Sequence, residues 1–169
     1  FAARINDVVR FHILKARDTA TLLTDVLAMR ERIAKQFPTQ NPWALKHARG
    51  GMVDLDFIAQ YLVLRYAPTH PVIWHRSAKQ VFEAVQTAAL LDETITAPLI
   101  AAKKFLSDLM SLLRLSAPGG LITDDAPTGL KTLLVQGMRL DAFDTLKHHV
   151  CLHETAVMEV FEAMKQGKL

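Results

Sequence analysis

The sequence predicts an all-α protein, a helical bundle of about six to seven helices around a buried central helix. Hydrophobic residues make up 50% of the 169 residues, and leucine, alanine and methionine dominate over β-branched and aromatic types, which favours helices over strands. Apolar residues also recur at helical spacing, and we find no strand pattern and no internal repeat. The length suits one domain with a sizeable core, so we treat residues 1–169 as a single domain.

Two helices are expected before the central one. The first covers residues 3–14 and has an apolar stripe of Ile5, Val8, Val9 and Ile13. Asp18 can cap the second helix, which runs to about Gln36. Its apolar face consists of Leu22, Leu23, Val26, Met29 and Ile33. Pro38 and Pro42 then end this helix and bracket a loop.

The central helix is expected over residues 52–66. It is apolar on most faces, and its polar residues are Asp54, Asp56, Gln60 and Arg65. Such a helix belongs in the middle of a bundle. Gly50 and Gly51 at its start indicate a bend that needs positive φ, or a backbone pressed closely against another group. The acidic residues in the first turn suit the positive end of the helix dipole.

Four further helices complete the expected bundle. One follows Pro71 and carries Val81, Phe82, Val85 and Leu90. The next starts between residues 94 and 98 and ends near Leu115, before a loop over residues 116–125. A short helix then begins at residues 126–127, with Asp125 as its cap and proline at an early position. The last spans residues 141–165, and its inward stripe is Leu146, Val150, His153, Val157, Phe161 and Met164.

Charge and cysteine content narrow the classes of function. The net charge is +3 and the basic residues are dispersed, which suits an acidic partner better than nucleic acid. The single cysteine, Cys151, excludes an internal disulfide and suits a reducing cytoplasm. We find neither a signal peptide nor an apolar run of membrane-spanning length. The chain begins at Phe1 inside an expected helix, so we expect it to be a fragment of a larger protein.

Residues 26–67 resemble a known family. They contain the pattern L-K-x-x-x-G-G-x-x-D-[IL]-[ED]-F-[IL]-x-Q-Y-L-V-L, preceded by Met29-Arg30-x-Arg32-Ile33. This is similar to the motif of the bacterial enzymes that adenylylate and deadenylylate glutamine synthetase in nitrogen control. The motif lies in the helical domain after a nucleotidyltransferase domain, and this version is closer to that of the second, adenylylating half. Asp56 stands where the family usually has Glu, which shortens the side chain by one methylene.

The resemblance implies a function for the parent protein. Such an enzyme transfers AMP from ATP to a tyrosine of glutamine synthetase, and its other half removes it. ATP and Mg²⁺ are bound by the nucleotidyltransferase domain, which these residues do not include. The implied partners are glutamine synthetase, the PII signalling protein and that adjacent domain. This chain is then expected to support the adenylylating active site and to help dock glutamine synthetase. The alternative is a helical protein-interaction or regulatory module with no share in an active site.

The pair Asp54 and Asp56 is the first candidate site. Nucleotidyltransferases hold Mg²⁺ with Asp-x-Asp on a strand, where residues i and i+2 point the same way. On a helix these positions diverge by roughly 200°. We therefore expect separate ion pairs, with Arg30, Arg32, Lys46 or Arg49 as partners, or one carboxylate that faces the neighbouring domain. No catalytic residue is expected in this chain.

The second candidate is a basic segment beside the glycines, which contains Lys46, His47 and Arg49. Basic side chains and free backbone N–H groups at a helix start can receive phosphate, although two glycines are also a common turn device and no Walker motif is present. The residues expected to face or support the active site are Lys46, Arg49, Gly50, Gly51, Asp54 and Asp56. The motif residues given a structural role are Arg30, Arg32, Phe57, Gln60 and Tyr61.

The third candidate is the histidine-rich segment of the last helix. His149 and His153 lie one turn apart, a usable spacing for two metal ligands, but Cys151 lies on another face. His153-Glu154 begins like H-E-x-x-H, yet Val157 occupies the second histidine position. We therefore expect an ordinary helix face and no metal site. Nothing places a nucleophile in a recognisable catalytic motif.

Overall fold

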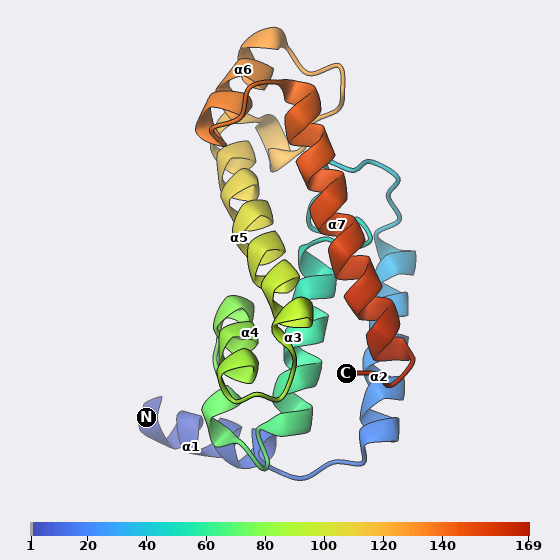
Figure 1. The fold of residues 1–169 in the computed structure, drawn as a ribbon, viewed down its shortest axis with the longest axis vertical. Helices are drawn as coiled ribbons and strands as arrows, with labels where there is room; N and C mark the ends of the chain where they lie inside the picture. Colours follow the sequence, from blue (N-terminus) through green and yellow to red (C-terminus); the bar gives the residue numbers. More distant parts are fainter. Residues whose placement is uncertain (1) are drawn as a thin grey trace.

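The computed structural model describes residues 2–169, including the side chains of all of them except residues 2, 3 and 118. This part of the chain forms seven α-helices and two short 3-10 helices, without a strand, which confirms the all-α prediction. The helices build an elongated bundle with α6 at one end and α1 at the other (Figure 1). None of the described helices combines the length and apolar character that crossing a membrane requires.

The helices occur in the predicted order along the chain. The α-helices are α1 (Ala2–Ile13), α2 (Thr19–Gln36), α3 (Met52–Tyr66), α4 (Ala78–Thr87), α5 (Glu93–Ser116), α6 (Thr128–Gly137) and α7 (Phe143–Lys165), and the 3-10 helices are η1 (Pro71–Ile73) and η2 (Pro118–Gly120). The predicted cap of α2 is confirmed, since Asp18 Oδ2 accepts the N–H of Thr21 at 2.8 Å. Helices α5 and α7 run antiparallel along the length of the bundle, and α6 connects them (Figure 1).

Helix α3 is the central helix, as predicted. It packs against α2, α4, α5 and α7. Leu55, Ile58 and Leu62 on this helix have no solvent exposure, and Gln60 is its one exposed residue. Because α3 contacts four other helices, the position of its first turn depends on packing from several directions.

The helices at the two ends of the bundle differ in how they match the prediction. Helix α1 forms as predicted, but Ile5, Val8 and Val9 of its apolar stripe are exposed, and Phe11 beside them is 72% exposed. Asp125 does not cap α6. The N-cap of that helix is Pro127, with no side-chain hydrogen bond, because α6 begins two residues later than predicted.

The inward stripe of α7 also differs at one position. Leu146, Val150 and Val157 are fully buried as expected, but Glu154 is buried where His153 was expected, and His153 is half-buried. Residue 154 follows Val150 by one full helical turn, so it lies on the same face. The chain therefore places a carboxyl group in its core.

Candidate functional site

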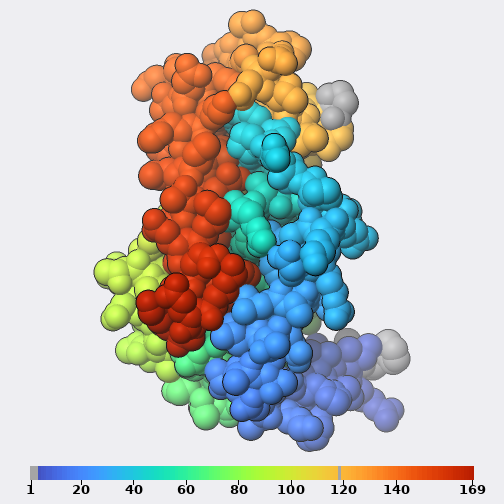
Figure 2. All heavy atoms as spheres, turned by 90° about the vertical axis from the view of Figure 1, so that its right-hand side faces the viewer, coloured from blue at the N-terminus to red at the C-terminus, as the bar shows by residue number. Residues whose placement is uncertain are grey.

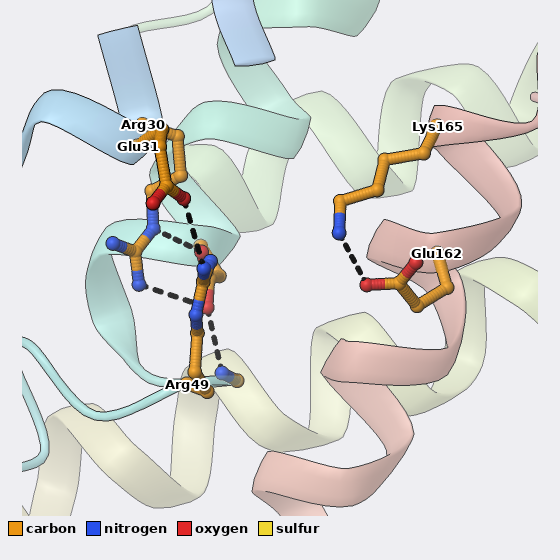
Figure 3. A network of polar contacts seen from close by, with 7 residues as sticks. Arg30, Glu31, Arg49, Glu162 and Lys165 are labelled. Atoms are coloured by element: carbon orange, nitrogen blue, oxygen red, sulfur yellow. Dashed lines mark hydrogen bonds and ion pairs between the residues drawn. The ribbon is translucent and has the colours of Figure 1, made fainter. Parts of the chain in front are cut away.

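A buried ion pair joins α2 to the first turn of α3. Arg30 Nε donates to Asp54 Oδ1, and Arg30 Nη2 donates to Asp54 Oδ2 at 3.2 Å. Each side chain is only 2% exposed. Figure 3 shows Arg30 with its polar contacts as dashed lines, and Arg49 and Glu31 close by. Arg30 is one of the four cationic partners that the sequence analysis proposed for the acidic pair. Each buried charge compensates the other, so the loss of either one would leave an unpaired charge in the core.

The two glycines before α3 form a turn pressed against other backbone segments. Gly50 has φ +76°, and a Cβ atom there would lie 1.9 Å from the carbonyl oxygen of Glu154 on α7. A Cβ atom on Gly51 would lie 2.4 Å from the carbonyl oxygen of Leu45. The N–H of Gly50 also donates to Asp54 Oδ2 at 2.6 Å. Both expected reasons for glycine, positive φ and close approach, are therefore present.

Glu154 of α7 lies beside Gly50 and Asp54, and the sequence analysis did not predict it as a site residue. It is 8% exposed, and its Oε1 atom is buried without a hydrogen-bond partner among the described residues. Burial, and secondarily the charge of Asp54, raises the pKa of Glu154 to about 7. The sequence does contain one sign of this burial, because Glu154 follows Val150 of the predicted inward stripe by four residues. Its carboxyl group titrates near neutral pH against a buried anion.

The basic segment does not act as one unit. Arg49 is exposed and pairs with Glu31 at 3.2 Å, and Lys46 is exposed as well. The ring of His47 stacks on Phe37 with 4.4 Å between ring centroids. Burial, then the charges of Lys46 and Arg30, lowers the pKa of His47. His47 is therefore mainly neutral at pH 7.

Asp56 lies on a different side of α3 from Asp54. Its Oδ1 accepts from Lys103 Nζ of α5 at 2.9 Å, and its side chain is 50% exposed. The two carboxylates thus have separate cationic partners and share no site, as helix geometry predicts. Asp56 and Gln60 line a cavity of about 480 Å³. Other residues at this cavity are Trp74, His75 and Arg76.

The remaining motif residues divide between core and surface. Tyr61 has no solvent exposure, and its hydroxyl accepts from Arg65 at 2.8 Å. Phe57 is half-buried against the core, whereas Arg32 is exposed.

The histidines of α7 lie against an aromatic side chain. The ring centroids of His149 and His153 are 6.4 Å apart, and both rings contact Phe105. Cys151 is exposed. Across residues 2–169, no three His, Cys, Asp or Glu side chains are close enough together to hold a metal ion.

Comparison with known proteins extends the resemblance from residues 26–67 to nearly the whole chain. The chain is 34% identical over 167 residues to the bifunctional glutamine synthetase adenylyltransferase/adenylyl-removing enzyme of Bradyrhizobium diazoefficiens. It is 33% identical over 162 residues to the enzyme of the same name from Xanthobacter autotrophicus. These matches cover 99% and 96% of this chain but only 17% and 16% of the relatives' lengths. No family model matches the chain.

Proposed function

We propose that this chain is the helical domain after the adenylylating nucleotidyltransferase domain of a bifunctional glutamine synthetase adenylyltransferase/adenylyl-removing enzyme. The observation that carries the proposal is the similarity of nearly the whole chain to one segment of relatives with that name. The parent enzyme then transfers AMP from ATP to a tyrosine of glutamine synthetase in the cytoplasm, and its other half removes it. Glutamine synthetase and the PII protein are partners of that whole enzyme.

ATP and Mg²⁺ belong, in this proposal, to the adjoining nucleotidyltransferase domain, where they supply the reactive phosphate and neutralise developing charge. The carboxylates of α3 do not fit a magnesium site. Asp54 is occupied by Arg30 and Gly50, and Asp56 pairs with Lys103. This chain on its own is therefore expected to transfer no adenylyl group.

In this proposal, the chain contributes by holding α3 and its side chains in a fixed position. The Arg30–Asp54 pair fixes the turn before α3, and the turn fixes the direction of the helix. Helix α3 then presents Asp56 and Gln60 on its open side, with Lys103 holding the Asp56 carboxylate in place. We assign this side of α3 to the contact with the nucleotidyltransferase domain, because a side chain that supports an active site must itself be held in one geometry.

A specific observation favours a second candidate, the protein-interaction module. Val8 and Phe11 on α1 are 58% and 72% exposed, and apolar side chains grouped on a surface mark interaction sites. In this alternative, α1 contacts a partner protein such as glutamine synthetase, and the open side of α3 has no part in catalysis.

Two carboxylates of this chain make a matched test. Asp56 and Asp108 each pair with a lysine of α5 at 2.9 Å, and their side chains are 50% and 53% exposed. In the full-length enzyme, Asp56→Asn should slow adenylyl transfer at least about tenfold, or about 1.4 kcal/mol, without a change in melting temperature. Asp108→Asn should retain the parent rate. Equal rates for both variants, with reduced transfer for Phe11→Ser, would instead support the interaction module.

A further inference from the structure

A second cavity, of about 280 Å³, lies between the loop before α3 and the end of α5. Residues 43–47 form one wall, and residues 119–121 form another. Figure 2 shows the loop around residues 37–50 (cyan) beside the segment after residue 120 (light orange). Asn41 Nδ2 joins these segments by donating to the carbonyl oxygen of Ile122 at 2.8 Å. The two segments that line the cavity are thus joined to each other by a hydrogen bond beside it.

Every charged side chain at this cavity is basic. Lys46, from the loop before α3, and Arg114, from α5, both line it, and neither forms an ion pair within the described residues. His47 also lines the cavity, and its Nδ1 atom is buried without a partner in that same part of the chain. The nearby acid, Asp124, is already bonded to Trp43 Nε1 and Lys147. Among the described residues, no carboxylate lines the cavity.

The rest of the lining is apolar. Met110 and Leu113 of α5 line it, and so do Leu121 and Trp43. The volume lies just below the usual range for ligand pockets, about 300–1,000 Å³, which suits a small molecule better than a nucleotide. An inorganic anion would leave the apolar walls uncovered, and a purely apolar ligand would leave Lys46 and Arg114 without an anionic partner. A molecule with an apolar body and an acidic group would cover the apolar walls and also pair with the two cations.

We propose that this cavity binds a small organic anion, an aliphatic or aromatic body that carries one carboxylate. The body packs against Met110 and Leu113, and the carboxylate pairs with the cations that line the cavity, Lys46 and Arg114. The loop that carries Lys46 is the same loop that Gly50 and Asp54 anchor, so an occupied cavity stabilises the start of α3. The proposal concerns a site separate from Asp56 and does not depend on the proposed enzyme function.

The test is a titration of the 169-residue chain with 3-phenylpropionate, followed by calorimetry and by the NMR signals of the two indole N–H groups. The neutral amide of the same acid and inorganic phosphate are the matched comparison ligands. We expect 3-phenylpropionate to bind at least about tenfold more tightly than either. We also expect it to shift the signal of Trp43 but not that of Trp74, which lines the other cavity.

Variants locate the site. Replacing both exposed cations, by Lys46→Gln with Arg114→Gln, should weaken binding about tenfold or more while the melting temperature stays unchanged. Lys104→Gln, an exposed lysine of α5 that pairs with Asp108, should leave binding unchanged. Three results would each overturn the proposal: equal binding of acid and amide, unchanged binding in the double variant, or no shift of the Trp43 signal on addition of the acid.

Discussion

Arg30 and Asp54 form an ion pair in which each side chain is only 2% exposed, and the same carboxylate accepts the N–H of Gly50 at 2.6 Å. One acidic residue thus connects α2, α3 and the turn between them. Removing one partner of such a pair leaves a buried charge uncompensated, which is more damaging than removing both.

Asp54→Asn should therefore destabilise the fold by about 3 kcal/mol and lower the melting temperature by about 10 °C. The double variant with Arg30→Leu and Asp54→Leu should be less destabilised than Asp54→Asn alone. Thermal melts followed by circular dichroism provide the measurement. An unchanged melting temperature for Asp54→Asn would show that this pair does not hold the turn.

Gly50 and Gly119 allow the effect of close approach to be separated from that of backbone conformation. Their φ angles are +76° and +73°, but a Cβ atom would collide with Glu154 only at Gly50 and would meet open space at Gly119. Gly119→Ala should cost about 1 kcal/mol, the left-handed penalty alone. Gly50→Ala should be clearly more destabilised in urea unfolding. Similar losses for the two variants would contradict the close packing of this turn against α7.

Glu154 makes stability depend on pH near neutrality. Its folded-state pKa of about 7 lies above the ordinary value of 4.5, so the folded state binds more protons than the unfolded state between these values. The stabilisation is complete below about pH 4.5 and is lost as pH rises through about 7. Glu154→Gln removes this titration and should gain up to about 3 kcal/mol relative to the parent between pH 5 and pH 8.

Two histidines act in the opposite direction, so the measurement must be a difference. The pKa values of His47 and His153 are lowered, chiefly by burial, and both residues destabilise the fold as pH falls below about 6.5. Both are retained in Glu154→Gln and cancel when urea unfolding of the two proteins is compared at each pH. A stability difference that stays constant from pH 5 to pH 8 would rule out the role assigned to Glu154.

The exposed side chains of α1 should contribute little to folding. Phe11 is 72% exposed, whereas Phe82 on α4 is fully buried. Phe11→Ser should change the free energy of unfolding by less than about 0.5 kcal/mol, and Phe82→Ser should cost at least about 3 kcal/mol. Chemical denaturation of both variants gives the comparison. A large loss for Phe11→Ser would mean that α1 packs more tightly than its exposure indicates.

Much of the fold could be predicted because its signals are local. The apolar run of α3 identifies the central helix, and glycine identity at residues 50 and 51 indicates a strained or crowded turn. The partner of Asp54 could be limited to four cations, of which Arg30 is the one in place. The helix and the turn depend on residue type and short spacing, which a sequence displays directly, whereas Arg30 lies 24 residues from Asp54 and only the structure selects it among the four cations.

The features that could not be predicted depend on which segments meet in space. Lys103 is 47 residues from Asp56, and Ile122 is 81 residues from Asn41, so nothing local announces these contacts. Helical periodicity allows the inward residue to be either three or four positions after the preceding one. For this reason His153 was predicted to face the core, whereas the buried residue is Glu154. The apolar stripe of α1 gave no indication of whether a partner helix would cover it.

The most direct test of the proposed function is a measurement of what lies against the open side of α3 in the intact enzyme. A photoreactive benzoylphenylalanine is placed at Gln60 on that side or, as a control, at exposed Gln136 at the end of α6. After irradiation, mass spectrometry identifies the crosslinked peptides. We predict crosslinks from position 60 to the adenylylating nucleotidyltransferase domain and none to that domain from position 136. The absence of such crosslinks from position 60, in an enzyme that still transfers AMP, would contradict the account.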